Sequence, residues 1–543
     1  MNPLAIIRVR GTQAEMGARH GAAVRALGGW EPLAAYYPTM PQRMLLGATR
    51  RGAADGAFLA VAQPVFAALL ASLERARPEP YLARTRAFAD ALGAPRLARH
   101  LATMDVFQNS VGTLARLGVV PPARAAAALP PACSSLAVWG TASHDGRLLH
   151  ARNFDFPGTG VWERVPAVVL CTPKEGLRYG FVTTRGADVP ATAFNEAGLV
   201  LTAHTRFHRD VTFSGAAIAD LCHDIVRRAA TVDEAIAVAR ERTIASSWGL
   251  LVSSAEPRRA VVIETASSGV EVYEPGGEYT ATTNHYQTPA LRVDEVVPSA
   301  AFAYDSKGRY ARLEHHARLG GRTVDDLKAM LGEQIGFDTG TARPTAGILG
   351  GPFTVASVVF DAEDGAVHVA VGDVPTARGP WIRVPWAWDG PPVEVHRAPE
   401  PSPEPAPAYA AYLHAVHLEQ SAADPSEVHA ALWRAADASP QPTYTFLAGV
   451  AALSEDDPGA VDLLVRAAAD EPSPYGRGRD LLWASRAADR FGRGALADDL
   501  RAALSTIDAP LLAGHHAAAR RERSRPYRRT RGVPVHPALC DAG

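Results

Sequence analysis

The helical pattern of the first part of the chain stops at two consecutive prolines, Pro130 and Pro131, and the residues after them have the pattern of a β-strand. Proline has no N–H to donate and restricts the preceding residue to extended conformations, so no regular helix continues through this point. Cys133 is therefore expected at the start of a strand, after an extended connection. The fold must place a helical segment, residues 1–132, ahead of a unit that is rich in strands.

The segment before the prolines has two further signals. Apolar residues recur at every third or fourth position through residues 30–130, which predicts helices. Residues 5–10 are expected to form a short strand, and Thr12 and Glu15 have the spacing of a capping box. A helix should therefore begin directly after Thr12.

A β-hairpin is predicted directly after Cys133. Residues 136–139 and 148–156 have strand patterns, and the dipeptide at 145–146 is Asp-Gly, a common hairpin turn. With that dipeptide at the centre of the turn, Trp139 would face Arg152, and Arg152 would share a sheet face with Cys133. Asp155 would point to the opposite face. We expect a bulge or a strand end between Arg152 and Asp155 if both side chains serve one pocket.

Strands and helices alternate through the rest of this unit. Amphipathic helices are predicted over residues 215–230 and 232–242, the second with Thr231 as its N-cap. Strand patterns are found at residues 165–170, 179–183, 199–202, 250–252, 260–264, 270–273, 355–360 and 367–371. Strands followed by helices and then by more strands indicate an α+β fold, an antiparallel sheet covered by helices.

The length of 543 residues exceeds what one hydrophobic core normally serves. Seven prolines lie between residues 391 and 407, so residues 391–408 are expected to be a semi-rigid linker after a core of residues 133–390. Residues 409–543 have helical periodicity without a fixed repeat. Arginines near the end of this extension could bind phosphate groups, although a solvated basic tail has the same pattern: Arg520, Arg521, Arg523, Arg525, Arg528, Arg529 and Arg531.

The composition excludes several classes of protein. The formal net charge of −2 gives no overall attraction to nucleic acid or to anionic lipid. The N-terminus lacks the basic and apolar regions of a secretory signal, and no stretch reaches membrane-spanning length. The four cysteines include no Cys-x-x-Cys pair, which disfavours a zinc site or a disulfide framework. We expect a cytoplasmic protein without metal, cofactor, nucleic-acid partner or membrane partner; a homo-oligomer stays open.

Cleavage of the Ala132–Cys133 bond would give Cys133 unusual chemistry. The residue would then carry a thiol and a free α-amine, whose ordinary pKa of about 7.7–8.0 allows it to act as a general base near neutral pH. The thiol could also perform the cleavage by attacking the carbonyl of Ala132. Arg152 would favour the thiolate, and Asp155 could hold the amine or the arginine. A purely structural Arg–Asp pair would look the same in the sequence.

The negative charge that develops during such an attack needs uncharged donors nearby. Asn195 and Asn284 each follow a strand-like run and are candidates, although either could be an ordinary turn residue. Two other interpretations stay open. In one, Cys133 and His285 belong to a papain-like triad in an uncleaved chain, which would require a helix after Cys133. In the other, the unit is a catalytically silent scaffold and the helical extension binds a partner.

Taken together, the motifs resemble those of the cysteine N-terminal-nucleophile hydrolases. They are Cys133-Ser134-Ser135, Arg152-Asn153-Phe154-Asp155, Asn195-Glu196-Ala197-Gly198-Leu199, Thr283-Asn284 and Ser306-Lys307-Gly308-Arg309-Tyr310-Ala311-Arg312. Within that group, the long leader before the cysteine resembles the family of acyl-CoA:6-aminopenicillanic acid acyltransferase. The resemblance implies a four-layer αββα sandwich, self-cleavage between Ala132 and Cys133, and a leader that stays bound.

The same resemblance implies roles for single residues. Cys133 would be nucleophile and base, with Arg152 and Asp155 assisting it. Asn195 and Asn284 would match the oxyanion and amine-holding positions, and Arg309 the arginine near the nucleophile, with Arg312 as a second candidate. The implied substrate is a small acyl amide or an acyl-CoA-like thioester. The chain departs from the family pattern at Ala132, where the penicillin enzyme has glycine, and over residues 409–543, which have no recognised counterpart.

Overall fold

The computed structural model describes residues 3–41, 43, 53–118, 132–398, 400–525, 527 and 534–541, with the backbone alone for residues 53–59. The extended connection predicted at Pro130 and Pro131 lies outside the described residues, as do Arg528, Arg529 and Arg531 of the basic tail.

The leader begins with a strand and continues as helices, as predicted. Helix α1 (Gln13–Leu27) starts after Thr12, whose hydroxyl accepts a hydrogen bond from the Glu15 N–H at 3.2 Å, while the Glu15 carboxylate accepts one from the Thr12 N–H at 2.7 Å. The predicted capping box is therefore confirmed. The other leader elements are β1 (Leu4–Gly11), α2 (Glu31–Tyr36), η1 (Tyr37–Thr39), α4 (Ala53–Ala76), α5 (Glu79–Leu92), α6 (Leu97–His100) and α7 (Thr103–Arg116).

Two sheets form the centre of the molecule. The smaller is antiparallel and has the order β11 (Tyr279–Thr282), β2 (Ala132–Gly140), β3 (Gly146–Asp155), β12 (Thr354–Asp361), β13 (Ala366–Ala370), β14 (Trp381–Pro385). The larger has the order β10 (Gly269–Tyr273), β9 (Arg258–Ala266), β8 (Trp248–Ala255), β7 (Leu199–Thr205), β6 (Thr192–Asn195), β5 (Tyr179–Thr184), β4 (Pro166–Pro173), β1, β15 (Val393–His396).

The last strand of the larger sheet corrects the predicted linker. Residues 393–396 form β15, which pairs antiparallel with β1 of the leader. These four residues lie between prolines and include none, so each retains the N–H that a ladder requires. On its other side β1 pairs in parallel with β4. The leader therefore contributes an internal strand to the larger sheet.

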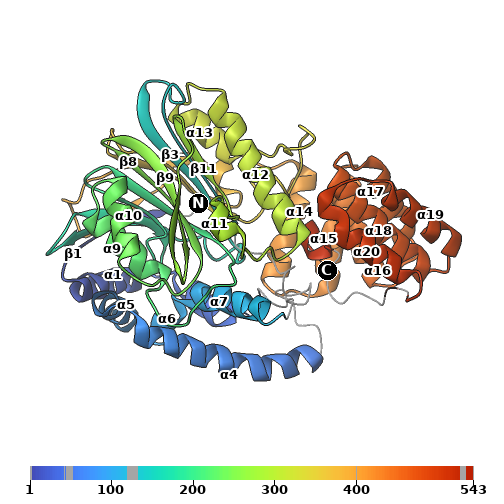
Figure 1. Ribbon diagram of the computed structural model, residues 1–543, viewed down its shortest axis with the longest axis horizontal. Helices are drawn as coiled ribbons and strands as arrows, with labels where there is room; N and C mark the ends of the chain where they lie inside the picture. Colours follow the sequence, from blue (N-terminus) through green and yellow to red (C-terminus); the bar gives the residue numbers. More distant parts are fainter. Residues whose placement is uncertain are drawn as a thin grey trace.

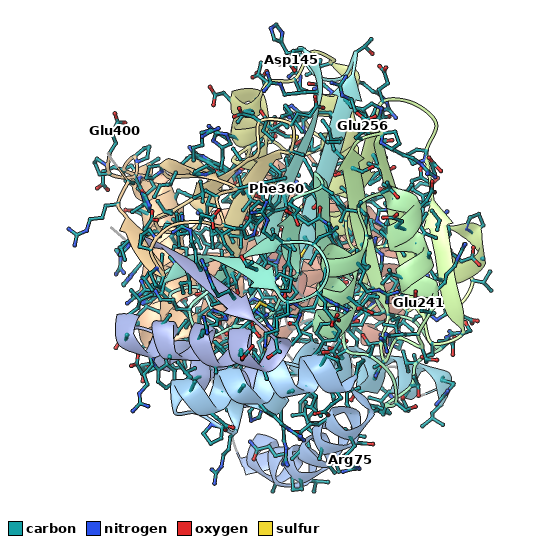
Figure 2. All side chains as sticks on the ribbon, turned by 90° about the vertical axis from the view of Figure 1, so that its left-hand side faces the viewer. Arg75, Asp145, Glu241, Glu256, Phe360 and Glu400 are labelled. Atoms are coloured by element: carbon teal, nitrogen blue, oxygen red, sulfur yellow. The ribbon has the colours of Figure 1, made fainter. Side chains whose placement is uncertain are left out.

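The sheets pack face to face, with Phe360 of β12 and Phe194 of β6 buried between them; Figure 2 labels Phe360 at the centre of the molecule. Helices α1, α5, α9 (Ile218–Arg228) and α10 (Val232–Arg240) cover the outer face of the larger sheet. Helices α12 (Ala300–Arg318) and α13 (Val324–Leu331) cover the smaller one (Figure 1). The predicted four-layer αββα fold is confirmed.

The β2–β3 hairpin differs from the predicted register. Arg152 lies opposite Ser135 instead of Trp139, because the turn spans the residues between Gly140 and Gly146 and a bulge follows Val138. The Glu278 carboxylate accepts a hydrogen bond from the Thr141 N–H at 2.7 Å, which holds the chain outside the ladder at this point. The register shift is an even number of residues, so Arg152 and Cys133 still share a sheet face.

The C-terminal extension is helical, as predicted. Its elements are α14 (Pro407–Gln420), α15 (Pro425–Ala438), α16 (Pro442–Ser454), α17 (Ala460–Asp470), α18 (Pro474–Arg490), α19 (Gly494–Ser505), η3 (Pro510–Leu512), α20 (Ala513–Glu522) and η4 (Pro537–Cys540). Ala301 and Tyr304 of α12 share its hydrophobic core, so the extension and α12 lie side by side (Figure 1). No helix among the described residues is long and apolar enough to cross a membrane.

Candidate active site

Cys133 is the second residue of β2, and only 1% of it is exposed. Its Sγ accepts a hydrogen bond from Arg152 Nη2 at 3.4 Å. Its backbone N–H donates to Asn284 Oδ1 at 2.8 Å, and its carbonyl accepts from Arg309 Nη1 at 2.6 Å. Three residues that the sequence predicted for the site therefore meet at this cysteine, from β3, from the loop after β11 and from α12.

The groups around the Cys133 thiol shift its pKa in opposite directions. Burial raises the pKa of Cys133 and is the largest effect, while the positive charges of Arg152 and Arg309 lower it and the negative charge of Asp155 raises it. The pKa lies above the ordinary value of a thiol. In the intact chain, the thiol is thus mostly protonated at neutral pH and must lose its proton during any attack.

Arg152 is held rigidly beside the thiol. Its guanidinium donates to the carbonyls of Ala191 and Ala203, the latter at 2.7 Å, and to Thr192 Oγ1. It also lies over the ring of Phe154, with 5.2 Å to the centroid. These acceptors carry no full negative charge, so the positive charge of Arg152 is directed at the sulfur.

Arg309 and Asn284 hold the backbone around Cys133. Arg309 Nη2 donates to Asn284 Oδ1 at 2.9 Å, so this oxygen accepts from both Cys133 and Arg309. Asn284 Nδ2 in turn donates to the Thr205 carbonyl at 3.1 Å. Arg312, the second candidate, instead pairs with Glu333 at 2.6 Å. The structure brings Arg309, and not Arg312, to Cys133.

Asp155 lies near Cys133 but on the other side of the sheet. It is the last residue of β3, opposite Ala132, and its carboxylate accepts from Thr354 Oγ1 at 2.6 Å. The irregularity next to it is in β12, where Val355 is inserted, so β3 does not turn Asp155 toward Arg152. Arg152 borders one cavity together with Cys133, and Asp155 borders another together with Ala132. Burial raises the pKa of Asp155 to about 7.

Asn195 is not brought to the other site residues. Its Nδ2 donates to the carbonyls of Val226 and Ala229 at 2.9 and 2.7 Å, and its Oδ1 accepts from the N–H groups of Ala197 and Leu199, both at 3.1 Å. These bonds tie the turn after β6 to the end of α9. None of them reaches Cys133.

The thiol borders an apolar cavity of about 130 Å³ between the sheets. Sequence reasoning did not identify its walls, since they come from distant segments. Those from the sheets and adjoining loops include Phe154, Phe156, Trp162, Val182, Val189, Ala203, Trp248 and Val358, and those from the leader are Tyr37, Met40, Leu101 and Met104. A second cavity of about 60 Å³ lies on the other side of β2 and is lined by Ala132, Asp155, Asp305 and Arg309, among others.

His285, the candidate of the papain-like interpretation, faces other groups. Its Nδ1 lies 3.0 Å from Ser306 Oγ and 3.2 Å from Thr283 Oγ1, and none of its hydrogen bonds joins it to Cys133. A strand follows Cys133 where that interpretation requires a helix. Among the residues that the structure describes, no three His, Cys, Asp or Glu side chains form a group that could hold a metal ion.

Comparison with known proteins confirms the resemblance found in the motifs. Residues 141–372 match the family model of acyl-coenzyme A:6-aminopenicillanic acid acyl-transferase. This segment includes Arg152, Asp155, Asn195, Asn284 and Arg309, and it begins after Cys133. No curated protein matches the chain.

Solved structures are also similar to this chain. A Caenorhabditis elegans ortholog of N-acylethanolamine-hydrolyzing acid amidase is 18% identical, with 42% of this chain and 93% of that one covered and a TM-score of 0.30. A variant of conjugated bile acid hydrolase from Clostridium perfringens is 12% identical, with 50% and 99% covered and a TM-score of 0.33.

Proposed function

We propose that this chain is a self-cleaving N-terminal-cysteine amidohydrolase or acyltransferase, which forms an acyl-enzyme on Cys133 from a small amide or thioester. The observation that carries the proposal is the position of Cys133, with Arg152 on its sulfur, Asn284 on its nitrogen and an apolar cavity beside it. The family match over residues 141–372 supports the same class of chemistry.

The first reaction would cut the chain. The Cys133 thiol loses its proton and its sulfur attacks the carbonyl carbon of Ala132. The C–N bond then breaks, the nitrogen of Cys133 gains a proton and becomes an α-amine, and Ala132 is left as a thioester on the sulfur. Water hydrolyses this thioester, which releases the Ala132 carboxylate and restores the thiol.

The processed enzyme would repeat the same chemistry on its substrate. The new α-amine stays next to Asn284 Oδ1, the acceptor that already lies 2.8 Å from the nitrogen in the intact chain. There it takes the thiol proton and delivers it to the leaving amine or thiol as the acyl group moves to the sulfur. Water completes a hydrolysis, and a second amine or thiol completes an acyl transfer. Arg152 favours the thiolate throughout.

The cavity indicates the size and the polarity of the acyl group. Its volume of about 130 Å³ resembles that of an engineered apolar cavity of about 150 Å³ that binds benzene, so a single ring or a short branched chain would fit. Since most of its walls are apolar, a charged acyl group would lose hydration on entry without finding enough partners.

The leader would remain bound after the cut, since it belongs to the fold. Arg84 of α5 forms buried hydrogen bonds with Asp188 at 2.8 and 2.9 Å, and Arg77 pairs with Asp220 of α9 at 2.7 Å. The leader also forms part of the cavity wall through Met104. Its loss would open the proposed acyl site.

Intact-mass analysis of the purified chain tests the proposal. The wild type should give one fragment that ends at Ala132 and one that begins at Cys133, and Cys133→Ala should stay intact. Cys222→Ala is the matched control, because Cys222 is also buried but lies on α9, and it should process normally. A wild-type chain that stays whole after prolonged incubation, with a Cys133 that acyl esters do not acylate, would contradict the proposal and favour the silent scaffold.

A further inference from the structure

The C-terminal extension is attached to the helix that carries Arg309. The carboxylate of Asp541, near the end of the extension, accepts a hydrogen bond from the Ala301 N–H in the first turn of α12 at 2.8 Å. The first N–H groups of a helix have no partner within it, and an acidic group there also complements the helix dipole. Tyr304 of α12 stacks on Tyr475 of the extension, with 4.6 Å between ring centroids. The extension thereby fixes the start of α12.

The same extension clamps the loop of residues 343–353. At one end of this loop, Arg343 donates to Glu471 of the extension at 3.0 Å, and both side chains are buried. At the other end, Phe353 belongs to the hydrophobic core of the extension. Between them Ala346 has φ of 67°, a left-handed conformation that costs energy for a residue with a Cβ and persists only where its surroundings hold it.

This loop contacts the residue that orients Arg309. The Gly347 N–H donates to Asp305 Oδ1 at 2.9 Å, and the other oxygen of Asp305 accepts from Arg309 Nε at 2.8 Å. Gly308, next to Arg309, lies so close to the loop that a Cβ there would approach Gly347 Cα to 3.1 Å. A displacement of the loop would therefore reach Asp305 and Arg309 directly.

The end of the extension also forms part of the smaller cavity. His536 and Ala538 line it opposite Ala132, Asp155 and Arg309. The residue before the proposed scissile bond thus faces a chamber whose walls come partly from the extension.

We propose that the C-terminal helical extension is a positioning element of the active site: it holds the loop 343–353, and through Asp305 this loop keeps the Arg309 guanidinium on the carbonyl of Cys133. Asp305 is then a positioning residue and Glu471 supports it from the extension. The inference rests on the proposed function, because the position of Arg309 matters to chemistry only if Cys133 reacts.

The test compares Asp305→Asn and Glu471→Gln with the wild type, in the full-length chain. The control is Asp462→Asn, which breaks an exposed ion pair with Arg493 within the same extension. Three quantities are measured: the rate of fragment formation, the melting temperature, and the pH midpoint of Cys133 alkylation by iodoacetamide. The alkylation is measured on the cleaved chain or, where no cleavage occurs, on the intact chain. The charged groups around Cys133 that set this midpoint are Arg152, Asp155, Arg206 and Arg309.

Asp305→Asn should slow fragment formation at least about tenfold, since small misplacements of reacting groups cost factors of this size or more. It should also raise the alkylation midpoint, because Arg309 lowers the pKa of Cys133. Glu471→Gln should act in the same direction with a smaller effect, Asp305→Glu should recover part of the rate, and Asp462→Asn should equal the wild type.

A variant Glu471→Gln that melts at a lower temperature but retains the wild-type rate and midpoint would overturn the inference and make the extension a scaffold only. Equal behaviour of Asp305→Asn and the wild type would overturn it as well. If the wild type fails to cut itself while both variants still raise the midpoint, the proposed processing fails and the positioning role stands.

Discussion

Replacing Arg152 by leucine tests what makes the Cys133 thiol reactive. Arg152 Nη2 lies 3.4 Å from the sulfur, and two unit charges about 4 Å apart interact by about 4 kcal/mol at an effective dielectric constant of about 20. This corresponds to about three pKa units at about 1.4 kcal/mol each. Loss of Arg152 should therefore raise the pKa of the Cys133 thiol further, although Arg309 still lowers it.

The assay is the rate of Cys133 alkylation by iodoacetamide against pH, followed by mass spectrometry of the peptide that contains the residue. The variant should reach its half-maximal rate at a pH at least about one unit above that of the wild type. Arg152→Lys should lie between them, since it keeps the charge but loses the planar fork that also holds Ala203 and Thr192.

Arg178→Leu is the control, because Arg178 forms an exposed pair with Glu196. Leucine at position 152 leaves several acceptors without a donor, so melting temperatures are needed and rates are compared where every variant is folded. An unchanged pH profile in Arg152→Leu would refute the reasoning: the thiol would then owe its reactivity to other groups.

Three further outcomes are expected. The pKa of Asp155 is about 7 in the folded chain and about 3.9 in the unfolded chain, so the stability of the wild type falls as pH rises between these values. In urea unfolding, Asp155→Asn should be more stable than the wild type by up to about 4 kcal/mol above pH ~7 and equally stable below pH ~4. Equal gains in stability at both pH values would contradict this. Met104→Ala should lose less than the about 2–5 kcal/mol typical of a fully buried methionine, since Met104 is only partly buried, and should turn acylation kinetics toward bulkier acyl esters. Met16→Ala, at a fully buried position outside the cavity, should lose stability alone. Identical ester preferences in the two variants would exclude Met104 from the acyl site. Arg84→Met should cost about 3–5 kcal/mol, because it leaves the buried Asp188 carboxylate with His20 as a partner but without the arginine charge. The double variant Arg84→Met/Asp188→Leu should recover much of this loss; no recovery would show that packing, not charge, is lost.

Local rules predicted the elements that depend on neighbouring residues. The capping box at Thr12 follows from residue spacing, and the shared sheet face of Cys133 and Arg152 follows from the alternation of side chains along a strand. This alternation gave the correct face even though the predicted register of the hairpin was wrong. Parity also placed Asp155 on the opposite face. A bulge in β3 was expected on the condition that Asp155 and Arg152 serve one pocket. The bulge lies in the neighbouring strand β12 instead.

Long-range contacts were beyond such rules. The pairing of β1 with β15 joins the start of the leader to the residues that follow the core, and no local pattern specifies it. Leader residues such as Met104 line the cavity for the same reason. Asn195 shows the converse: its motif is a strong turn signal, and in the structure its side chain holds a turn.

The place of β1 between β4 and β15 fixes an order of events. A sheet with an internal strand from the leader can be assembled within one chain as a unimolecular process. The proposed later cut before Cys133 would remove only the covalent connection. Once unfolded, the two pieces would have to find each other in solution, so refolding would become concentration-dependent. Heating and cooling should then be reversible for uncut Cys133→Ala and much less so for the processed enzyme. Self-cleavage would act as a one-way step: the chain folds as one molecule, and the covalent connection is dispensable afterwards.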